Sequence, residues 1–404
     1  MGKIFQDAVH GTINLCDKSV KIIDTIEFQR LRNIKQLGSA YYVFPSASHN
    51  RFEHSLGTAY LAKTLLETIS QKQPELGVTE QDLEDVEIAG LCHDVGHGPF
   101  SHLFDDVYLR ERDLDGHPFR HHEERSIEIL RKMIEKYEIP ITSESFKRIS
   151  LMINPTDKVK KHYLYQIVSN SKNGIVVDKF DYIARDGNAL GIKYGFEHHR
   201  IFPHVKVIKN ELCYSDKVIF NVYELFDNRF KLHKQIYNHP TVKKLDLLIS
   251  DYLRNLDKIY PKMGKALDDL DVFCELTDNI LELPFLLDEE MILEEKRGDL
   301  RKLREMMRKL KERKLYKVLD EVRLKPLEEV EKVFREWKMK NEYEGELIYL
   351  KKRLSFSSSS QNPLYKVKFY SKDGLLKRKD IDLVMGGLVP RQFEEFSLVI
   401  FSKE

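Results

Sequence analysis

Apolar residues recur at helical spacing along most of the chain, which predicts a mainly α-helical protein. Between residues 19 and 37 they fall on one face of a predicted helix. A second helix is expected over 54–66, before the polar break at 71–74, and a third apolar helical run ends at residue 92. Further helices are expected over 125–170, interrupted at Ile139-Pro140, and over 178–186.

Short alternating runs predict strands in two parts of the chain. Residues 205–208 and 211–214 alternate around Lys209-Asn210, a typical hairpin turn. Near the C-terminus, 365–370 and 397–401 are predicted strands around a helix, after a Ser-rich loop at 355–360. The Lys-, Arg- and Glu-dense region 285–345 favours long helices such as 298–312. We therefore predict a small β-containing region within a helical core and an α+β C-terminal lobe.

Composition adds limits on partners and compartment. The chain has 404 residues, and 66 basic against 65 acidic side chains leave a net charge of +1, so no strongly basic face is implied overall. Four cysteines, at 16, 92, 213 and 274, show neither paired metal spacing nor a disulfide framework, which indicates a reducing compartment, the cytoplasm or the nucleus. No apolar run approaches 18 residues, so we expect no membrane partner.

The candidate chemistry centres on residues 87–102, where an apolar helical run ends in His93-Asp94. An imidazole and a carboxylate side by side suit Mn, Fe, Zn or Mg, and His54 and Asp178 are candidates to complete the ligand set. Most His-Asp pairs are ordinary surface residues. Here the glycines at 96 and 98 are expected to turn the backbone sharply, and the nearby histidines at 97 and 102 add titratable groups.

Three further spacings bring polar side chains onto one helix face. Arg51 lies three residues before His54, which places a guanidinium suited to phosphate beside a metal ligand. Asp178, Tyr182 and Asp186 stand four apart, and so do Arg229, His233 and Tyr237. A solvated, salt-bridged face is the alternative for each set, and His121-His122 before a helical run could be only a helix start.

The chain resembles the HD-domain superfamily of metal-dependent phosphohydrolases, and within it the animal SAM-and-HD-domain deoxynucleoside triphosphate (dNTP) triphosphohydrolases. The matching stretches are 28–38, 41–45, 48–57, 89–104 and 173–186, with weaker similarity to the C-terminus. The resemblance implies an HD-domain helical phosphohydrolase core at 49–285, between an N-terminal segment at 1–48 and a regulatory or oligomerisation lobe at 286–404. We expect no SAM domain before the first motif.

The resemblance also assigns roles to the candidate residues. It implies a divalent metal (Fe, Zn, Mn or Mg) on His54, His93, Asp94 and Asp178, with additional Mg accompanying the nucleotides. Catalytic roles fall to His97, His102, His122 and Asp105. Substrate contacts fall to Gln36 and Leu37 at the sugar and to Arg51, Lys179, Tyr182, Asp186, Arg229, His233, Tyr237 and Asn238, the last standing where the family has Gln.

Two activator sites are part of the implied family pattern. A site for GTP or dGTP across a subunit interface, and hence a dimer or tetramer, would use Lys3, Ile4, Asp24, Gln29, Arg32, Arg313 and Lys317. A second site for a dNTP matches at Val43, Phe44, Arg200, Lys217, Asn221 and His239. Three of its basic positions are lost, because they hold Ser215, Gln235 and Pro240. We therefore expect activation by a guanine nucleotide with little dependence on a second dNTP.

Two other functions remain as alternatives from the sequence. An HD-type nucleotidase or phosphodiesterase would not need Arg51 and Lys179 to hold a triphosphate tail. An HD protein that binds single-stranded nucleic acid could use the basic clusters at 296–317 and 349–353.

Overall fold

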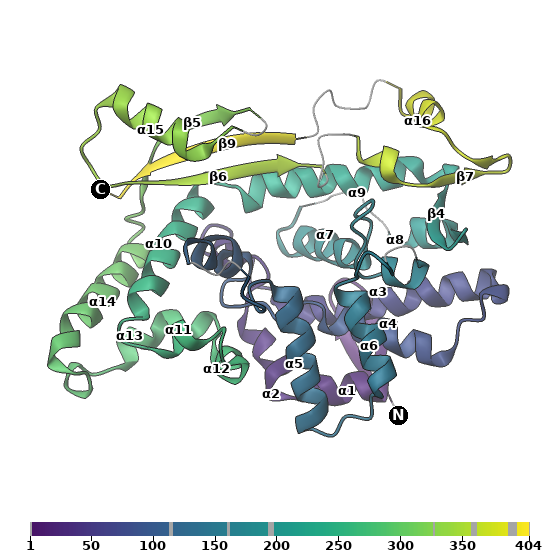
Figure 1. Ribbon diagram of the computed structural model, residues 1–404, viewed down its shortest axis with the longest axis horizontal. Coiled ribbons are helices and arrows are strands. Elements are labelled where there is room, and N and C mark those ends of the chain that lie inside the picture. The colour runs from purple at the N-terminus through teal and green to yellow at the C-terminus, as the bar shows by residue number, and fades with distance from the viewer. Residues whose placement is uncertain are drawn as a thin grey trace.

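The computed structural model describes residues 2–112, 116–159, 162–192, 198–325, 328–356, 362–386 and 394–403. Helices form the body of the molecule, and a thin layer of strands lies across one side of it (Figure 1). The helices are α1 Asp17–Ile23, α2 Ile26–Gln29, α3 Arg51–Lys72, α4 Glu80–Cys92, α5 His122–Lys136, α6 Ser143–Ile153, α7 Val177–Ala189, α8 His198–Ile201, α9 Ile219–Leu232, α10 Pro240–Leu256, α11 Lys262–Lys265, α12 Leu270–Glu275, α13 Leu283–Leu286, α14 Arg297–Lys311, α15 Val330–Asn341 and α16 Arg378–Met385. The predicted mainly α class is confirmed.

Helix α3 is the central helix of the core. Its start is fixed by Asn50, whose side chain accepts a hydrogen bond from the Glu53 backbone N–H at 3.2 Å. Buried residues occur on most sides of α3, since α4 and α7 both pack against it. The helix predicted over 54–66 is therefore confirmed and extends further in both directions, and the motif histidines lie at the packed centre of the protein.

The single helix predicted over 19–37 is wrong. The Thr25 side chain accepts a hydrogen bond from Phe28 N at 3.2 Å and so begins a new helix, α2, after α1 has ended. A 3-10 turn, Arg30–Asn33, follows, and Ile34 is extended. The break predicted near Ile139 separates α5 from α6, but beyond Ile153 the described part of the predicted helix holds only the 3-10 turn Tyr163–Gln166.

Two small sheets flank the helical core. Strands β1 Lys3–Asp7 and β2 Gly11–Leu15 form an N-terminal hairpin. The predicted hairpin of β3 Val205–Ile208 and β4 Glu211–Ser215 is confirmed, with positive φ angles of 50° and 62° at Lys209 and Asn210. Strand β7 Phe369–Ser371 pairs parallel with β4, and β8 Gly374–Leu375 completes that sheet. Of the strand predicted over 365–370, only 369–370 are in β7, because 365–366 belong to the 3-10 turn Pro363–Lys366 and 367–368 are irregular.

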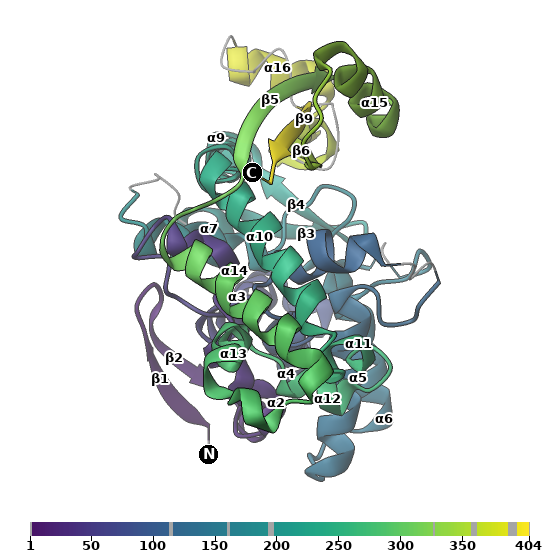
Figure 2. The ribbon, with the colours of Figure 1, turned by 90° about the vertical axis from the view of Figure 1, so that its left-hand side faces the viewer.

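The C-terminal lobe is built on an antiparallel sheet of β5 Lys317–Leu324, β9 Glu394–Ser402 and β6 Leu347–Ser355, with β9 in the centre. Figure 2 shows this sheet and α15 above the packed pair α10 and α14. The helix predicted at 298–312 and the strand at 397–401 are confirmed, whereas β5 and β6 were not predicted. Residues 357–360 of the predicted Ser-rich loop lie outside the described residues.

Candidate active site

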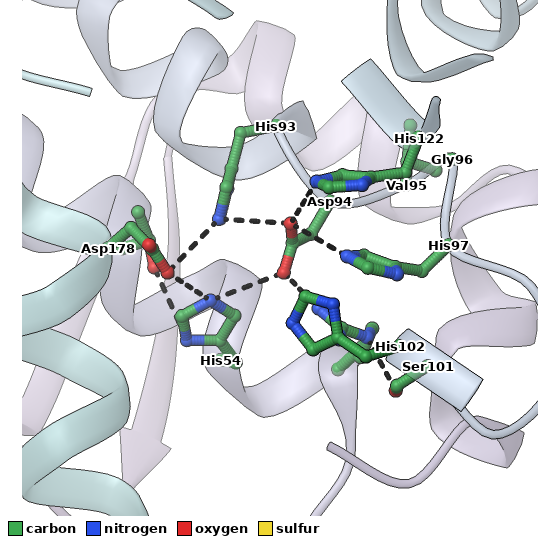
Figure 3. Close-up of polar contacts among 12 residues, drawn as sticks. His54, His93, Asp94, Val95, Gly96, His97, Ser101, His102, His122 and Asp178 are labelled. Atoms are coloured by element: carbon green, nitrogen blue, oxygen red, sulfur yellow. Dashed lines mark hydrogen bonds and ion pairs between the residues drawn. The ribbon is translucent and has the colours of Figure 1, made fainter. Parts of the chain in front are cut away.

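Three helices bring the predicted metal ligands together at the centre of the core. His54 lies in the first turn of α3, His93 and Asp94 follow the end of α4, and Asp178 lies in the first turn of α7 (Figure 3). His54 Nε2 is 3.1 Å from Asp178 Oδ1 and 3.4 Å from Asp94 Oδ2. His93 Nε2 is 3.6 Å from Asp178 Oδ1 and 3.4 Å from Asp94 Oδ1. The four predicted ligands therefore form one cluster.

The chemistry of this cluster fits a divalent cation. His54 Nδ1 contacts Asp181 Oδ2 at 2.7 Å and His93 Nδ1 contacts the Gly90 carbonyl at 2.8 Å, so each Nδ1–H can donate outward and leave Nε2 with a free lone pair. Both Nε2 atoms are buried and make no hydrogen bond of acceptable geometry within the described part of the chain. Ligand atoms of His54, His93 and Asp178 lie within 4.8 Å of one another. Such an oxygen and nitrogen set is typical of Zn, Fe or Mn.

The charges of the cluster are balanced by neighbours. Burial opposes ionisation of Asp94, but the neighbouring His93 imidazole and the Arg51 guanidinium hold its pKa well below the usual range. Arg51, itself buried, forms an ion pair with Asp94 and donates from Nε to Ser101 Oγ at 2.8 Å. The predicted placement of a guanidinium next to the metal ligands is therefore present in the structure.

Behind the cluster lies a buried carboxylate that the sequence analysis missed. Asp181 contacts His54 on one side, and its Oδ1 is 2.6 Å from His10 Nε2 on the N-terminal hairpin. Arg185 donates to both oxygens of Asp181 at 2.9 Å and to Asp7 at 2.9 Å. A Cβ at Gly57 would overlap Asp181, so α3 needs glycine there. No local signal marks Asp181, because His10 and His54 are distant in sequence.

The three predicted catalytic histidines are neighbours on the other side of Asp94. The rings of His97 and His122 stack with centroids 4.0 Å apart, and His102 meets His97 edge-on at 5.1 Å. Burial, with the charges of Arg51 and His122, holds the pKa of His97 well below its usual range. The side chain of His102 is 68% exposed, so it lies at the mouth of the site.

Asp105 links this histidine group to Arg125 of helix α5. It sits in a π-helical turn, Phe104–Tyr108, a form common at functional sites. Its Oδ2 is 3.3 Å from His122 Nδ1, and Arg125 pairs with its other oxygen. Burial lowers the pKa of His122, but the hydrogen bond with Asp105 and the negative charges of Glu123, Asp94 and Asp105 together raise it above the usual value. Ligand atoms of Asp94, His97 and His122 also lie within 4.8 Å of one another, so this group could hold a cation too.

A cavity of about 710 Å³ opens from the cluster. All predicted substrate residues line it: Gln36, Leu37, Arg51, Lys179, Tyr182, Asp186, Arg229, His233, Tyr237 and Asn238. Asp178, His93, Asp94 and the three catalytic histidines line it as well, whereas His54 and Asp105 lie behind its wall. The sequence analysis thus selected residues that do share one pocket.

Two details of the pocket differ from a simple helical face. Helix α9 ends at Leu232, and His233 and Tyr237 belong to a π-helical turn that brings their rings to 4.9 Å. The Tyr237 hydroxyl donates to Asp186, which also contacts His49 Nε2 at 2.7 Å. Lys179 Nζ donates to the Gly174 carbonyl at 2.5 Å, and burial near Arg229 lowers its pKa to about 7.

The predicted activator residues lie outside this cavity. Lys3 Nζ is 3.7 Å from Asp24, Arg32 donates to Gln29 at 2.8 Å, and Ile4 is 69% exposed. Arg313 donates to the Tyr42 carbonyl and Lys317 begins β5, while Phe44 and His239 meet edge-on at 5.6 Å. Arg200 belongs to α8 and Asn221 to the first turn of α9, while Lys217 and Val43 lie in and beside 3-10 turns. Figure 2 shows β1 at the lower left of the molecule and β5 at its top.

Comparisons with known proteins agree with this geometry. Residues 51–186 match the model of the HD domain family. A SAMHD1 homolog of Dictyostelium discoideum, called a deoxynucleoside triphosphate triphosphohydrolase, is 34% identical over 418 residues, covering 99% of this chain and 77% of that protein. The SAMHD1 enzyme of the same name from Gallus gallus is 34% identical over 462 residues, covering 99% and 72%. A putative HD domain-containing protein of Acanthamoeba polyphaga mimivirus is 41% identical over 297 residues, covering 70% and 64%.

Proposed function

Because the chain belongs to the family of the SAMHD1 deoxynucleoside triphosphate triphosphohydrolases, we propose that it hydrolyses dNTPs to deoxynucleoside and triphosphate. The observation that carries the proposal is the buried cluster of His54, His93, Asp94 and Asp178 at the base of a pocket lined with cations. In this reaction a water oxygen bonds to the α-phosphorus while the bond from that phosphorus to the 5′ oxygen breaks.

The four ligands would hold a divalent metal, which acts as a Lewis acid and lowers the pKa of water when bound. Arg51, Lys179 and Arg229 face the same cavity and would neutralise the phosphate oxygens. An imidazole nitrogen of His102 would give a proton to the leaving 5′ oxygen, because a protonated imidazole can act as a general acid and this ring lies at the cavity mouth. His97, His122 and Asp105 would position these groups and the attacking water.

Selection of deoxyribose requires a wall that leaves no room for a 2′ hydroxyl. Leu37 and Tyr237 are the walls that we propose, with Gln36 beside them. Tyr237 is held by its hydrogen bond to Asp186, and the buried Gln36 Oε1 has no hydrogen-bond partner among the described residues. A polar atom in that state is available to a ligand.

Control of the enzyme is proposed to come from outside the pocket. GTP or dGTP, with Mg, would bind between copies of the chain at Lys3, Asp24, Gln29, Arg32 and the 313–317 region, so that the active form is a homo-oligomer. In this scheme residues 1–48 and 286–404 serve regulation and 49–285 serve catalysis. The cytosol or nucleus is the compartment we propose, because all four cysteines are unpaired thiols. None of the described helices is long and apolar enough to cross a membrane.

Product analysis tests the proposal. Each dNTP is incubated with the protein and Mn or Mg, with and without GTP, and the products are separated. Deoxynucleoside and intact triphosphate in equal amounts are expected. Monophosphate with pyrophosphate, or activity only on monophosphates or cyclic nucleotides, would favour another HD hydrolase. Steeply salt-dependent retention of single-stranded nucleic acid on filters, without hydrolysis, would favour the binding protein.

A further inference from the structure

Asp278 is a carboxylate that lies outside the HD match and beyond the residues assigned above. It is the first residue of the 3-10 turn Asp278–Glu282. Its Oδ1 accepts a hydrogen bond from the backbone N–H of Phe100 at 2.6 Å, and its Oδ2 accepts one from the backbone N–H of Lys35 at 2.9 Å. One side chain therefore joins two segments that are 65 residues apart and lie on either side of the site.

Both segments form walls of the cavity. Lys35 directly precedes Gln36 and Leu37, and Phe100 precedes Ser101 and His102. The two segments also touch directly, because Ser101 Oγ donates to the Lys35 carbonyl at 2.7 Å. At Gly38, whose φ is +50°, a Cβ would overlap the Phe100 carbonyl. The sugar-facing segment and the His102 segment therefore pack backbone to backbone.

The His102 segment has a conformation that needs outside support. Phe100 and Ser101 have φ angles of 62° and 59°, a left-handed region that side chains other than glycine rarely adopt. Such residues keep this backbone only when surrounding contacts impose it. The contacts here are Asp278 on the Phe100 N–H, and Arg51 and the Lys35 carbonyl on the Ser101 hydroxyl.

The arrangement requires a carboxylate at this position. Two converging N–H groups need two acceptor oxygens, whereas an amide offers one oxygen and turns an NH₂ group toward the second donor. Burial raises the pKa of Asp278 to about 6, against the two backbone hydrogen bonds and the charges of Lys35 and Arg51. The Tyr42 hydroxyl lies close enough that, in addition to its burial, the charge of Asp278 raises its pKa. The ionised form at neutral pH is thus kept in a site that disfavours charge.

We propose that Asp278 is a positioning residue for substrate selection, which fixes the Gln36–Leu37 sugar wall against the His102 segment through its two backbone hydrogen bonds. The inference rests on the proposed function, because the sugar wall acts only on a nucleotide in this cavity. Asp278 touches no substrate itself. Its loss should loosen the sugar wall and the proton donor together, while leaving the metal ligands unaffected.

The test compares Asp278→Asn with Glu282→Gln, a matched removal of charge on the same 3-10 turn, where the exposed Glu282 side chain pairs with Lys311 at 3.4 Å. For each protein, kcat and KM are measured for a dNTP and for the matching ribonucleotide. We expect Asp278→Asn to reduce the ratio of the two kcat/KM values by about tenfold, since a pocket wall rejects an added hydroxyl only about 100-fold. Metal content should equal that of the wild type, and Glu282→Gln should leave the ratio unchanged.

Hydrogen exchange gives a readout that does not depend on activity. Asp278→Asn should speed exchange in peptides covering 34–38 and 98–103 together, because Lys35 and Phe100 lose their acceptors. An unchanged ratio with the wild-type exchange pattern overturns the proposal, and so does faster exchange with an unchanged ratio, which makes Asp278 structural only. If the wild type hydrolyses no dNTP, the proposed function fails, and unchanged exchange would separately reject the link between the segments.

Wild-type protein offers the same test if the variant does not fold. Lowering the pH through about 6 protonates Asp278 and replaces one acceptor by a donor. The discrimination ratio should fall below that pH, because ionisation of the catalytic groups and of the triphosphate affects both substrates alike. A ratio that stays constant from pH 7.5 to pH 5 overturns the proposal.

Discussion

One chain brings all the metal ligands together in a buried cluster, whereas it leaves the proposed guanine-nucleotide residues exposed and in separate regions. His54 and Asp94 have side chains 0% and 7% exposed and meet residues from two other helices. Lys3 and Asp24 have side chains 53% and 58% exposed, and Figure 2 shows β1 at the lower left of the molecule but β5, which carries Lys317, at its top. A buried cluster can hold its ligand alone, whereas exposed and separated contacts can enclose a nucleotide only if another chain covers it. We therefore expect catalytic competence and activation to be separable by substitution.

The largest effect is expected from Asp178→Ala. Loss of this carboxylate removes both charge and a ligand, so metal content should fall and turnover should drop at least ~1000-fold, equivalent to several kcal/mol. Metal analysis, rates and circular dichroism together measure it. Stoichiometric metal with near wild-type rates would show that the cluster is not the catalytic centre.

His102→Ala should lower kcat by ~100- to 10,000-fold, with a much smaller effect on substrate binding, because its proposed role is proton donation in the transition state. His121→Ala is the matched control, since His121 is exposed beside the site and caps α5 without a side-chain hydrogen bond. Single-turnover rates and substrate affinity distinguish the two steps. If the turnover number is unchanged, His102 returns to a structural role.

The double substitution Lys3→Ala and Arg32→Ala tests the proposed guanine-nucleotide site. Each lost charge-assisted contact is worth ~1.5–3 kcal/mol, so the double change should weaken activation by GTP more than ~100-fold. Metal content should not change. Lys21→Ala, an exposed lysine of α1, is the control. The measurements are the hydrolysis rate as a function of GTP concentration and the oligomer mass by light scattering. If GTP activates the double variant as it activates the wild type, the activator binds elsewhere.

The smallest effect is expected from a second dNTP activator. The family resemblance implies basic residues at the positions that Ser215, Gln235 and Pro240 occupy here, so we expect a triphosphate there to bind several orders of magnitude more weakly. With GTP present, a non-hydrolysable dNTP analogue should leave hydrolysis of a fixed low dNTP concentration unchanged, apart from competition. A steep rise in rate and oligomer size at micromolar analogue would contradict this.

Residues whose signal is local could be predicted from the sequence. The three-residue spacing of Arg51 and His54 does place both at the start of α3, and the four-residue spacing of Asp178, Tyr182 and Asp186 does hold on α7. Asp181 and Asp278 could not be predicted, because the histidines that contact Asp181 and the backbone N–H groups that contact Asp278 lie 127 to 243 residues away.

The glycines after His93-Asp94 show a second limit. The backbone does turn at 94–97 and 98–101 as predicted, but neither Gly96 nor Gly98 has a positive φ, so a left-handed conformation is not what requires glycine there. A Cβ at Gly96 would overlap the backbone of α5, and one at Gly98 would overlap the Phe104 ring. The left-handed residues are instead Phe100 and Ser101. Likewise the sequence predicts β5 as part of a charged helical region, because its pairing strand β9 comes only at residues 394–402.

The central position of β9 has a consequence for synthesis of the protein. Strands β5 and β6 pair only through β9, so both emerge from the ribosome with unpaired edges that stay open until residues 394–402 follow. At ~5–20 residues per second, the 38 residues between the end of β6 and the start of β9 take several seconds. During that time the unpaired N–H and C=O groups of both strands can form hydrogen bonds with strands of other chains. A stop codon before β9 should therefore yield aggregates rather than a shorter soluble enzyme.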